Sequence, residues 1–419
     1  MSSTLETGRL RIRMYRVGFG ECFLVSLPED NRHRHLLVDC GVHQRGNLNQ
    51  MARVVADVRT ESGDHLDAVI VTHAHQDHIS GFGTEADAFA QVTVDEIWMP
   101  WTEDPSDSQA LRLRAKQLAL ARQLRAHLKH LKRLTPSTDA LLENAVGFSL
   151  ASNAESMRVA RGGFKGTQNV RYLEAGDRLT RASGIAALNV QVLGPSRDES
   201  ALRRMDPPAG QRWLGGAASS GDYTVQPFAR QEQSRKQFHA SNRRRFGNAG
   251  TAVALTHQEE RELQGAAVAS DSLALKLDSV LNNTSLVLLL RYRGAVMLFP
   301  GDAQWGSWEK WLTKQGADAL LGEITFLKVG HHGSHNATPR TLLAKLSHPE
   351  ISAMISTQDE PWDSIPKGNL VADLTRHCKR RVARSDSIKL GSGPYVAGPT
   401  RLPRAFKRGE FWIDYQKDL

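Results

Sequence analysis

Cysteine is scarce in this chain of 419 residues, which contains only Cys22, Cys40 and Cys378. The three lie far apart, their number is odd, and none belongs to a CxxC pair. This pattern argues against a disulfide framework and against a zinc site built from cysteines. It is typical of a protein that works in a reducing compartment.

Long apolar segments are missing as well. No run of about 18 uncharged apolar residues occurs, which argues against a membrane-spanning helix. The N-terminus also lacks the apolar core of a secretory signal, since it begins MSSTLETGRLRIRMYRVG. We therefore expect a cytoplasmic protein without membrane contact.

Basic residues outnumber acidic ones, 54 to 45, so the net charge is +9 and the pI is near 9.6. A basic surface concentrates polyanions around a protein, and nucleic acid is the polyanion that we expect as a partner. The alternative is a soluble surface that is simply rich in arginine.

Strand and helix patterns alternate near both ends of the chain. Residues 1–105 contain short strand patterns, a helical pattern near 49–59 and the apolar run 66–72. Residues 281–419 resume the alternation, with apolar runs before the segments Gly301-Asp302 and 331–334. We therefore predict an α/β fold in two halves.

The middle of the chain, residues 106–280, has a different composition. It begins with a helical pattern over Ser108–Leu134 that carries eight Lys or Arg residues and no acid. Strand patterns follow at 172–177 and 188–195, and residues 196–272 are polar. We interpret this region as a large insertion that is basic and polar but contributes some core strands.

A dense group of possible metal ligands follows the apolar run 66–72: His73, His75, Asp77 and His78. Histidines at i and i+2 in a turn point to the same side, and the other two side chains can face a second ion about 3.5–4 Å away. Imidazole and carboxylate suit zinc, iron or manganese, so the ligand types leave the metal open. A chance surface cluster is the alternative, but the position after a buried strand argues against it.

The segment His73-x-His75-x-Asp77-His78 is similar to the HxHxDH signature of the metallo-β-lactamase superfamily, and the chain resembles its competence-protein (ComEC-like) hydrolase branch. Five further segments match that branch in order: 17–21 (VGFGE), 37–41 (LVDCG), 282–287 (NNTSLV), 299–302 (FPGD) and 327–334 (LKVGHHGS). The resemblance implies an αββα sandwich, here with a large insertion, and a site at one edge.

The resemblance also implies ligand roles. His73 and His75 would bind the first of two divalent ions, zinc or manganese, and Asp77 and His78 the second. Asp302 would bridge both ions. One histidine of the pair 331–332 would complete the second site; we favour His332, with His331 facing the substrate, although the reverse order is open.

The chain departs from many family members at the third ligand of the first ion. Asn282 and Asn283 stand where those members have a histidine, so we expect these residues beside the first ion and leave its third ligand open. Asp39 is predicted to support the histidine segment by hydrogen bonding. The nearby His33, His35 and His43 are expected on the surface.

Two divalent ions activate water near neutral pH and stabilise both the attacking and the leaving oxygen of a displacement. We expect Asp77 to orient the attacking water, and His331 and Ser334 to hold a phosphoryl oxygen or to protonate the leaving group.

The basic residues favour nucleic acid, DNA or RNA, as the substrate of a phosphodiesterase. Neighbouring aromatic residues would stack on bases. The candidate contact residues are Arg112, Lys116, Arg122, Arg125, Lys129, Arg235, Lys236, Arg243, Arg244 and Arg245. Each basic cluster could instead be a solvated face, and the Arg/Leu helix or the insertion could bind a protein partner.

Two alternatives to a nuclease remain from the sequence. One is a phosphodiesterase or esterase of the same fold that acts on small molecules. The other is a metal-bound interaction protein without catalysis. The sequence does not decide between endo and exo cleavage or the oligomeric state.

Overall fold

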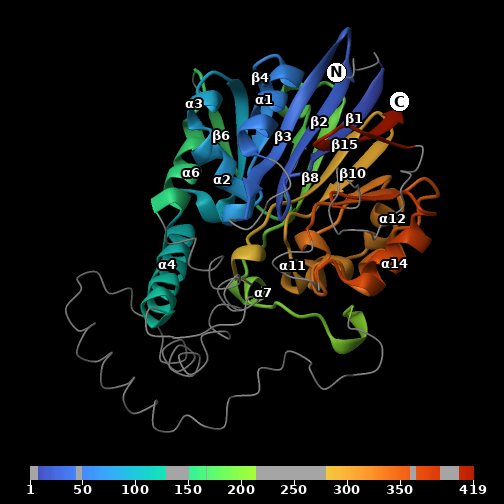
Figure 1. The fold of residues 1–419 in the computed structure, drawn as a ribbon. Helices are drawn as coiled ribbons and strands as arrows, with labels where there is room; N and C mark the ends of the chain where they lie inside the picture. The colour runs from blue at the N-terminus through green and yellow to red at the C-terminus, as the bar shows by residue number, and fades with distance from the viewer. Residues whose placement is uncertain are drawn as a thin grey trace, which may run out of the picture.

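The computed structural model describes residues 8–43, 50–128, 151–166, 168–213, 280–358, 365–386 and 405–419. Their strands form two sheets that lie face to face, with helices on the outer side of each (Figure 1). This four-layer α/β/β/α arrangement confirms the predicted sandwich.

The first sheet has eight strands among the described residues. Its spatial order is β14 (Phe406–Arg408), β15 (Trp412–Asp418), β1 (Arg9–Tyr15), β2 (Gly20–Glu29), β3 (Arg32–Val42), β4 (His65–Ile70), β5 (Thr93–Pro100) and β6 (Asn169–Leu173). Strands β3 to β6 run parallel, whereas β15, β1, β2 and β3 pair antiparallel. The C-terminal strand therefore lies beside the N-terminal one.

The second sheet has seven strands among the described residues. Its order is β13 (Val382–Arg384), β12 (Ser352–Ile355), β11 (Phe326–Lys328), β10 (Ala295–Phe299), β9 (Val287–Tyr292), β8 (Leu188–Gly194) and β7 (Arg178–Thr180). Strands β10 to β13 run parallel. Strands β6, β7 and β8 come from the region 106–280, so part of that region belongs to the two sheets.

Helices cover the outer faces of the sheets. The first sheet is covered by α1 (Met51–Ser62), α2 (Gln76–Thr84), α3 (Ala86–Phe89) and α6 (Ala151–Gly162). The second sheet is covered by α11 (Trp305–Leu312), α12 (Ala317–Gly322), α13 (Arg340–Lys345) and α14 (Gly368–His377). Short turns are α7 (Glu199–Leu202), η1 (Trp101–Glu103), η2 (Ala182–Gly184), η3 (Ala209–Gln211) and η4 (His331–Gly333).

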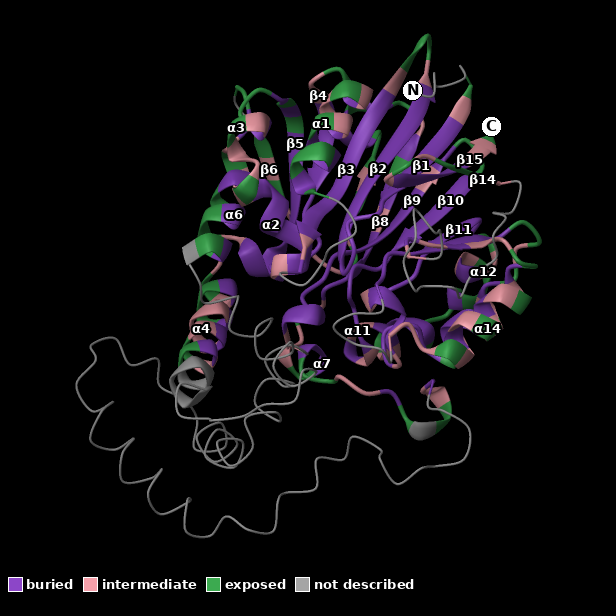
Figure 2. Ribbon diagram, in the orientation of Figure 1, coloured by how far each residue is buried: buried purple, intermediate pink, exposed green. Residues whose placement is uncertain are grey.

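Strand residues alternate between the two sides of each sheet, as the period of two requires. In β1, Leu10, Ile12 and Met14 face the core between the sheets, while Tyr15 packs under the helices. Apolar residues on both sides explain the unbroken apolar runs of the sequence, and the strands are buried along most of their length (Figure 2).

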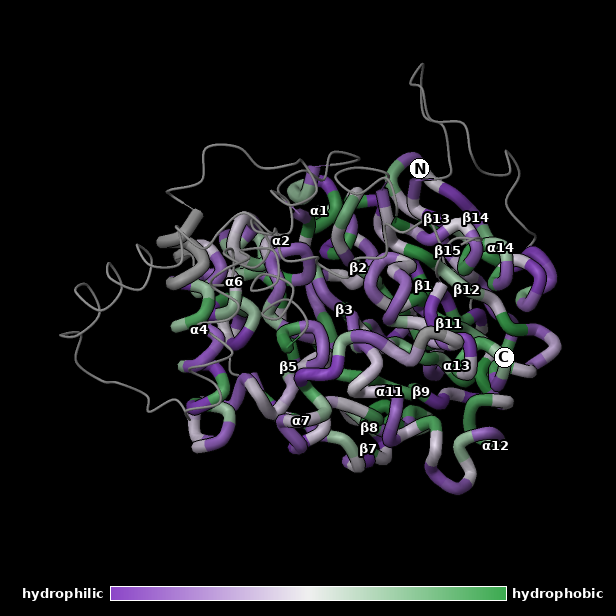
Figure 3. Tube along the Cα trace, turned by 90° about the horizontal axis from the view of Figure 1, so that it is seen from below, coloured by the Kyte–Doolittle hydropathy of each residue, from purple (hydrophilic) through white to green (hydrophobic). Residues whose placement is uncertain are grey.

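Helix α4 (Ser108–Leu128) projects beyond the sheets (Figure 1). Ala110, Leu113, Gln117 and Ala121 form its buried face, whereas Leu111 is exposed. Hydrophilic and hydrophobic residues alternate along the helix in Figure 3. Among the described residues, no helix combines the length and the hydropathy needed to cross a bilayer.

Candidate metal centre

The candidate ligands all lie at one edge of the sandwich, near α2 and α11 in Figure 1. Parallel strands bring their carboxyl ends to the same edge, and loops there carry functional residues in α/β folds. Segment 72–78 follows β4 and runs into the first turn of α2, Asp302 follows β10, and η4 with His331 and His332 follows β11. The two sheets therefore contribute ligands from opposite sides.

Four of the predicted ligands form a closed ring of side chains. The Nε2 atom of His78 lies 3.1 Å from Oδ2 of Asp302 and 3.8 Å from Oδ2 of Asp77. The Nε2 atom of His332 lies 3.0 Å from the same Asp77 oxygen and 3.8 Å from the same Asp302 oxygen. A tetrahedral zinc ion with bonds of 2.0–2.1 Å requires ligand atoms about 3.3 Å apart. The four distances scatter around that value, so these residues fit one divalent ion.

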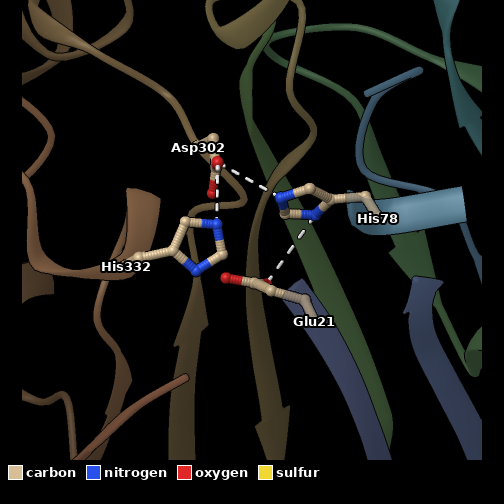
Figure 4. Close-up of side chains that lie close together, drawn as sticks. All are labelled: Glu21, His78, Asp302 and His332. Carbon is tan, nitrogen blue, oxygen red and sulfur yellow. Dashed lines mark hydrogen bonds and ion pairs between the residues drawn. The ribbon is translucent and has the colours of Figure 1, made fainter. Parts of the chain in front are cut away.

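Figure 4 shows three of these side chains, His78, Asp302 and His332, pointing toward one another from separate elements. Glu21, near the start of β2, approaches His78 from the other side of the imidazole, with its Oε2 atom 3.9 Å from Nδ1. Together with Glu21, these residues are a buried group that could hold a metal ion.

His73 and His75 form a second, adjacent pair. Nε2 of His73 lies 2.9 Å from Nδ1 of His75, and both residues interact electrostatically with Asp302. Asn282 hydrogen-bonds to His75, so its side chain lies beside this pair. Asn283 points elsewhere, because its amide donates to the backbone oxygens of Leu202 and Arg204.

In three of the candidate ligand histidines, Nδ1 forms a hydrogen bond with a group that is not itself a candidate metal ligand. Nδ1 of His78 pairs with Oδ2 of Asp39 at 2.8 Å, and Nδ1 of His332 with the backbone oxygen of Ser356 at 2.8 Å. Nδ1 of His73 lies 3.0 Å from Oγ1 of Thr72, whose hydrogen is donated to Asp39. Each Nδ1 is therefore protonated, which leaves Nε2 to bind a metal.

The backbone is strained where it supports these groups. Asp39, His331 and His332 have φ values of 54°, 47° and 52°, in the left-handed region that side chains other than glycine rarely adopt. Asp39 holds its position by accepting hydrogen bonds from N and Oγ1 of Thr72, both at 2.7 Å. Such strain clusters at functional sites, where the surrounding contacts maintain it.

The protonation states differ between the two ligand sets. Burial and the neighbouring His78 hold the pKa of His73 well below its usual value, and burial lowers that of His75 to about 4. Burial would also lower the pKa of His78, but the carboxylates of Asp302 and Asp77 raise it well above its usual value. Burial thus favours the neutral, metal-binding form of the first pair, whereas the neighbouring carboxylates favour the protonated form of His78.

The side chain of His331 begins a chain of hydrogen bonds. Its Nδ1 atom lies 3.0 Å from Oγ of Ser334, which donates to Oδ1 of Asn336. Asn336 in turn hydrogen-bonds to Asp206, which also contacts His335. The chain leaves Nε2 of His331 as a proton acceptor, and burial lowers the pKa of this imidazole to about 4.

Two charged residues at the centre were given no role by the sequence analysis. Glu21 and Lys328 are both 1% exposed and form an ion pair beside Asp302. In the sequence, only their positions within the matched segments 17–21 and 327–334 pointed to these two residues. The expectation of surface histidines is wrong for His35 and His43, which are buried because they lie within or just after β3.

The predicted nucleic-acid contacts are described only in part. On α4, Arg112 and Arg122 are exposed and Lys116 is half-buried. Arg125 lies in α4, but its side chain is outside the described set. The remaining candidates lie outside the described residues: Lys129, Arg235, Lys236, Arg243, Arg244 and Arg245.

Comparison with known proteins gives one family. The model of the metallo-beta-lactamase superfamily matches residues 15–146, a range that contains β2 to β5 and the segment His73–His78. No curated protein matches the chain. Beyond the matched range, the second sheet and the loops carrying Asp302 and His332 complete the same architecture. The match covers 132 of the 419 residues, less than a third of the chain. Over that range the chain is similar to the metallo-beta-lactamase superfamily, whose members are mostly metal-dependent hydrolases, and the two-sheet fold and the metal-ligand cluster agree with this similarity.

Proposed function

We propose that this protein is a phosphodiesterase of the competence-protein-like branch that uses two divalent ions, zinc or manganese, and acts on nucleic acid. The observation that carries the proposal is the pair of adjacent ligand sets, His73 with His75 and Asp77 with His78 and His332, both of which interact with Asp302. This arrangement supports two neighbouring ions that share one carboxylate.

Bound ions would supply activated water at neutral pH and would neutralise charge on a phosphoryl group. The protein's own residues orient the reactants. Oδ1 of Asp77 is buried and has no hydrogen-bond partner among the described residues, so it is free to accept a hydrogen bond from the attacking water. The hydrogen bond between Nδ1 of His331 and Oγ of Ser334 keeps the His331 ring in place.

The preference for a long polyanion rests on charge. The net charge of +9 and the exposed Arg112 and Arg122 on α4 support attraction of a phosphate backbone. A small phosphodiester would gain little from such a surface. Activity on nucleic acid should therefore fall steeply with salt, whereas activity on a small diester should change little.

The test is a hydrolysis assay of the purified full chain with Mn²⁺ or Zn²⁺. Its substrates are single- and double-stranded DNA, RNA and bis(p-nitrophenyl) phosphate. We expect cleavage of nucleic acid that is lost in the double variant Asp77→Ala/His78→Ala. Hydrolysis of the chromogenic diester without any cleavage of nucleic acid would show a small-molecule enzyme instead. Metal binding without hydrolysis of either substrate would show a non-catalytic protein.

A second set of variants tests the role of α4. The triple change Arg112→Ala/Lys116→Ala/Arg122→Ala removes three cations and should reduce the slope of log activity against log salt by about two to three. Arg158→Ala is a matched control, because Arg158 is an exposed arginine of α6 that pairs with Glu155. An unchanged slope in the triple variant would exclude α4 as a contact surface.

A further inference from the structure

Lys328 is a buried lysine whose hydrogen-bonding capacity is fully used. It ends β11 in the second sheet, and its ammonium group has three N–H donors. Nζ lies 2.8 Å from the backbone oxygen of Gly301 and 3.4 Å from Oδ1 of Asp302, and it forms an ion pair with Glu21. Three donors thus meet three acceptors, so no donor remains to contact a substrate.

The two oxygens of Asp302 have different partners. Oδ1 faces Nζ of Lys328 and accepts a hydrogen bond of 3.1 Å from the backbone N–H of His331. Oδ2 faces Nε2 of His78 and, at 3.8 Å, Nε2 of His332. The carboxylate is therefore held on one side by fixed donors and presents a single oxygen to the ligand ring.

The ion pair also joins the two sheets. Glu21 belongs to β2 of the first sheet, and Lys328 to β11 of the second. Burying two charges in this way adds little net stability, because desolvation offsets their attraction. A buried ion pair at this place is better explained by the orientation that it imposes on its neighbours.

We propose that Lys328, held by Glu21, is a positioning residue that occupies Oδ1 of Asp302, so that Oδ2 alone is shared by the two metal sites. The inference rests on the proposed two-ion function and goes beyond it by assigning a role to the buried pair. Lys328 acts through Asp302 and does not contact the substrate.

The test measures magnetic coupling between two Mn²⁺ ions in the full chain by electron paramagnetic resonance. A single shared oxygen couples neighbouring Mn²⁺ ions, so the wild type loaded with two equivalents should give a coupled multiline spectrum. In Lys328→Met, Oδ1 of Asp302 loses the ammonium group and keeps the backbone N–H of His331, so the carboxylate is held less firmly and we expect the coupled signal to fall by at least half. Manganese content should stay the same or rise, because the variant removes a cation beside the site. The fall in kcat should approach 100-fold.

Two further variants keep the outcome interpretable. Glu21→Gln is nearly isosteric and should weaken the coupling less than Lys328→Met, while the double variant should be no worse than Lys328→Met alone. Lys345→Met is the matched control, because Lys345 pairs with Asp318 at the surface of α13. Thermal melting shows whether each variant folds.

The results separate this proposal from the proposed function. A coupled spectrum that is unchanged in folded Lys328→Met would overturn the positioning role, as would a wild type that shows no coupled pair. A normal coupled pair in the wild type, lost in Lys328→Met but without hydrolysis of any phosphodiester, would support the positioning role and contradict the phosphodiesterase.

Discussion

At the scale of single residues, hydrogen bonds decide which atom of each side chain remains available to bind a metal ion. Asp39, Thr72 and the backbone of Ser356 take up Nδ1 of three histidines, and Lys328 takes up one oxygen of Asp302. Outer partners of this kind set the orientation and basicity of metal ligands. Metal affinity should therefore depend on residues that never touch the ion.

Asp39→Asn tests this dependence. Oδ1 of Asp39 accepts from N of Thr72, and Oδ2 accepts from Oγ1 of Thr72 and from Nδ1 of His78. The amide has one acceptor oxygen and one NH₂ donor, so it cannot accept at both positions as the carboxylate does. We expect metal affinity, measured by titration calorimetry, to fall roughly 10–100-fold. Asp30→Asn is the matched control, because Asp30 also has a positive φ but lies in an exposed turn. Equal affinity in both variants would contradict the role of Asp39.

Asn282→His tests whether the first ligand set, His73 with His75, lacks a third ligand at this position. An imidazole at this position would join Nε2 of His73 and Nδ1 of His75 as a third nitrogen ligand. Since outer partners alone change affinity by roughly 10–100-fold, a direct ligand should strengthen zinc binding at this set at least about tenfold. The measurement is a competition titration with a zinc chelator. No gain would show that Asn282 does not occupy the ligand position.

At the scale of elements, the segment that includes α7 and residues 203–213 contacts the loop that follows His331 and His332. It offers backbone oxygens to Asn283, Asp206 contacts Asn336, and the indole N–H of Trp213 donates to the backbone oxygen of Thr338. These contacts tie a piece of the region 106–280 to the loops of the second sheet. The positions of the His331 and Ser334 side chains thus depend on a segment that is distant in sequence.

Gly306→Ala should release this segment. Gly306 lies in α11, and a Cβ atom there would stand 1.7 Å from the backbone oxygen of Ala201. We expect a loss of about 1–3 kcal/mol in the free energy of unfolding, measured with urea, because the segment must move away. Gly368→Ala in α14 is the control: nothing lies within 4 Å of its added Cβ, so it should be neutral or slightly stabilising. Equal stability of the two variants would contradict the close contact.

At the scale of the whole molecule, the last strand closes the first sheet against the first strand. Arg13 of β1 makes a two-point contact with Asp414 of β15 at 2.8 and 2.9 Å, and both side chains are fully buried. The guanidinium also lies over Trp412, 3.9 Å from the ring centroid. The two ends of the chain are thus joined by buried ionic contacts at Asp414, which also lies 3.9 Å from Nη1 of Arg11.

Asp414→Ala should be strongly destabilising, because it leaves the buried charge of Arg13 with fewer partners. We expect a loss of about 3 kcal/mol, at the lower end for broken buried pairs, since Asp57 and Glu61 still face Arg13. Asp418→Ala, at the exposed pair with Arg9, should change the free energy of unfolding by less than about 1 kcal/mol. Chemical denaturation of both variants measures the difference, and similar losses would contradict the buried contact.

Patterns local in sequence were sufficient to predict an α/β fold and the cluster of ligands at 73–78, whereas the αββα sandwich and the roles of Asp302 and His332 were implied by the family resemblance. Apolar runs produced the strands, and the short spacing of His73, His75, Asp77 and His78 required them to lie together wherever the segment folded. The partners of those ligands were beyond such reasoning. Glu21 and Lys328 are 307 positions apart, Asp206 and Asn336 are 130 apart, and Arg13 and Asp414 are 401 apart. Which charges meet in the interior is set by the packing of two sheets, because only burial next to a partner makes a charge stable there.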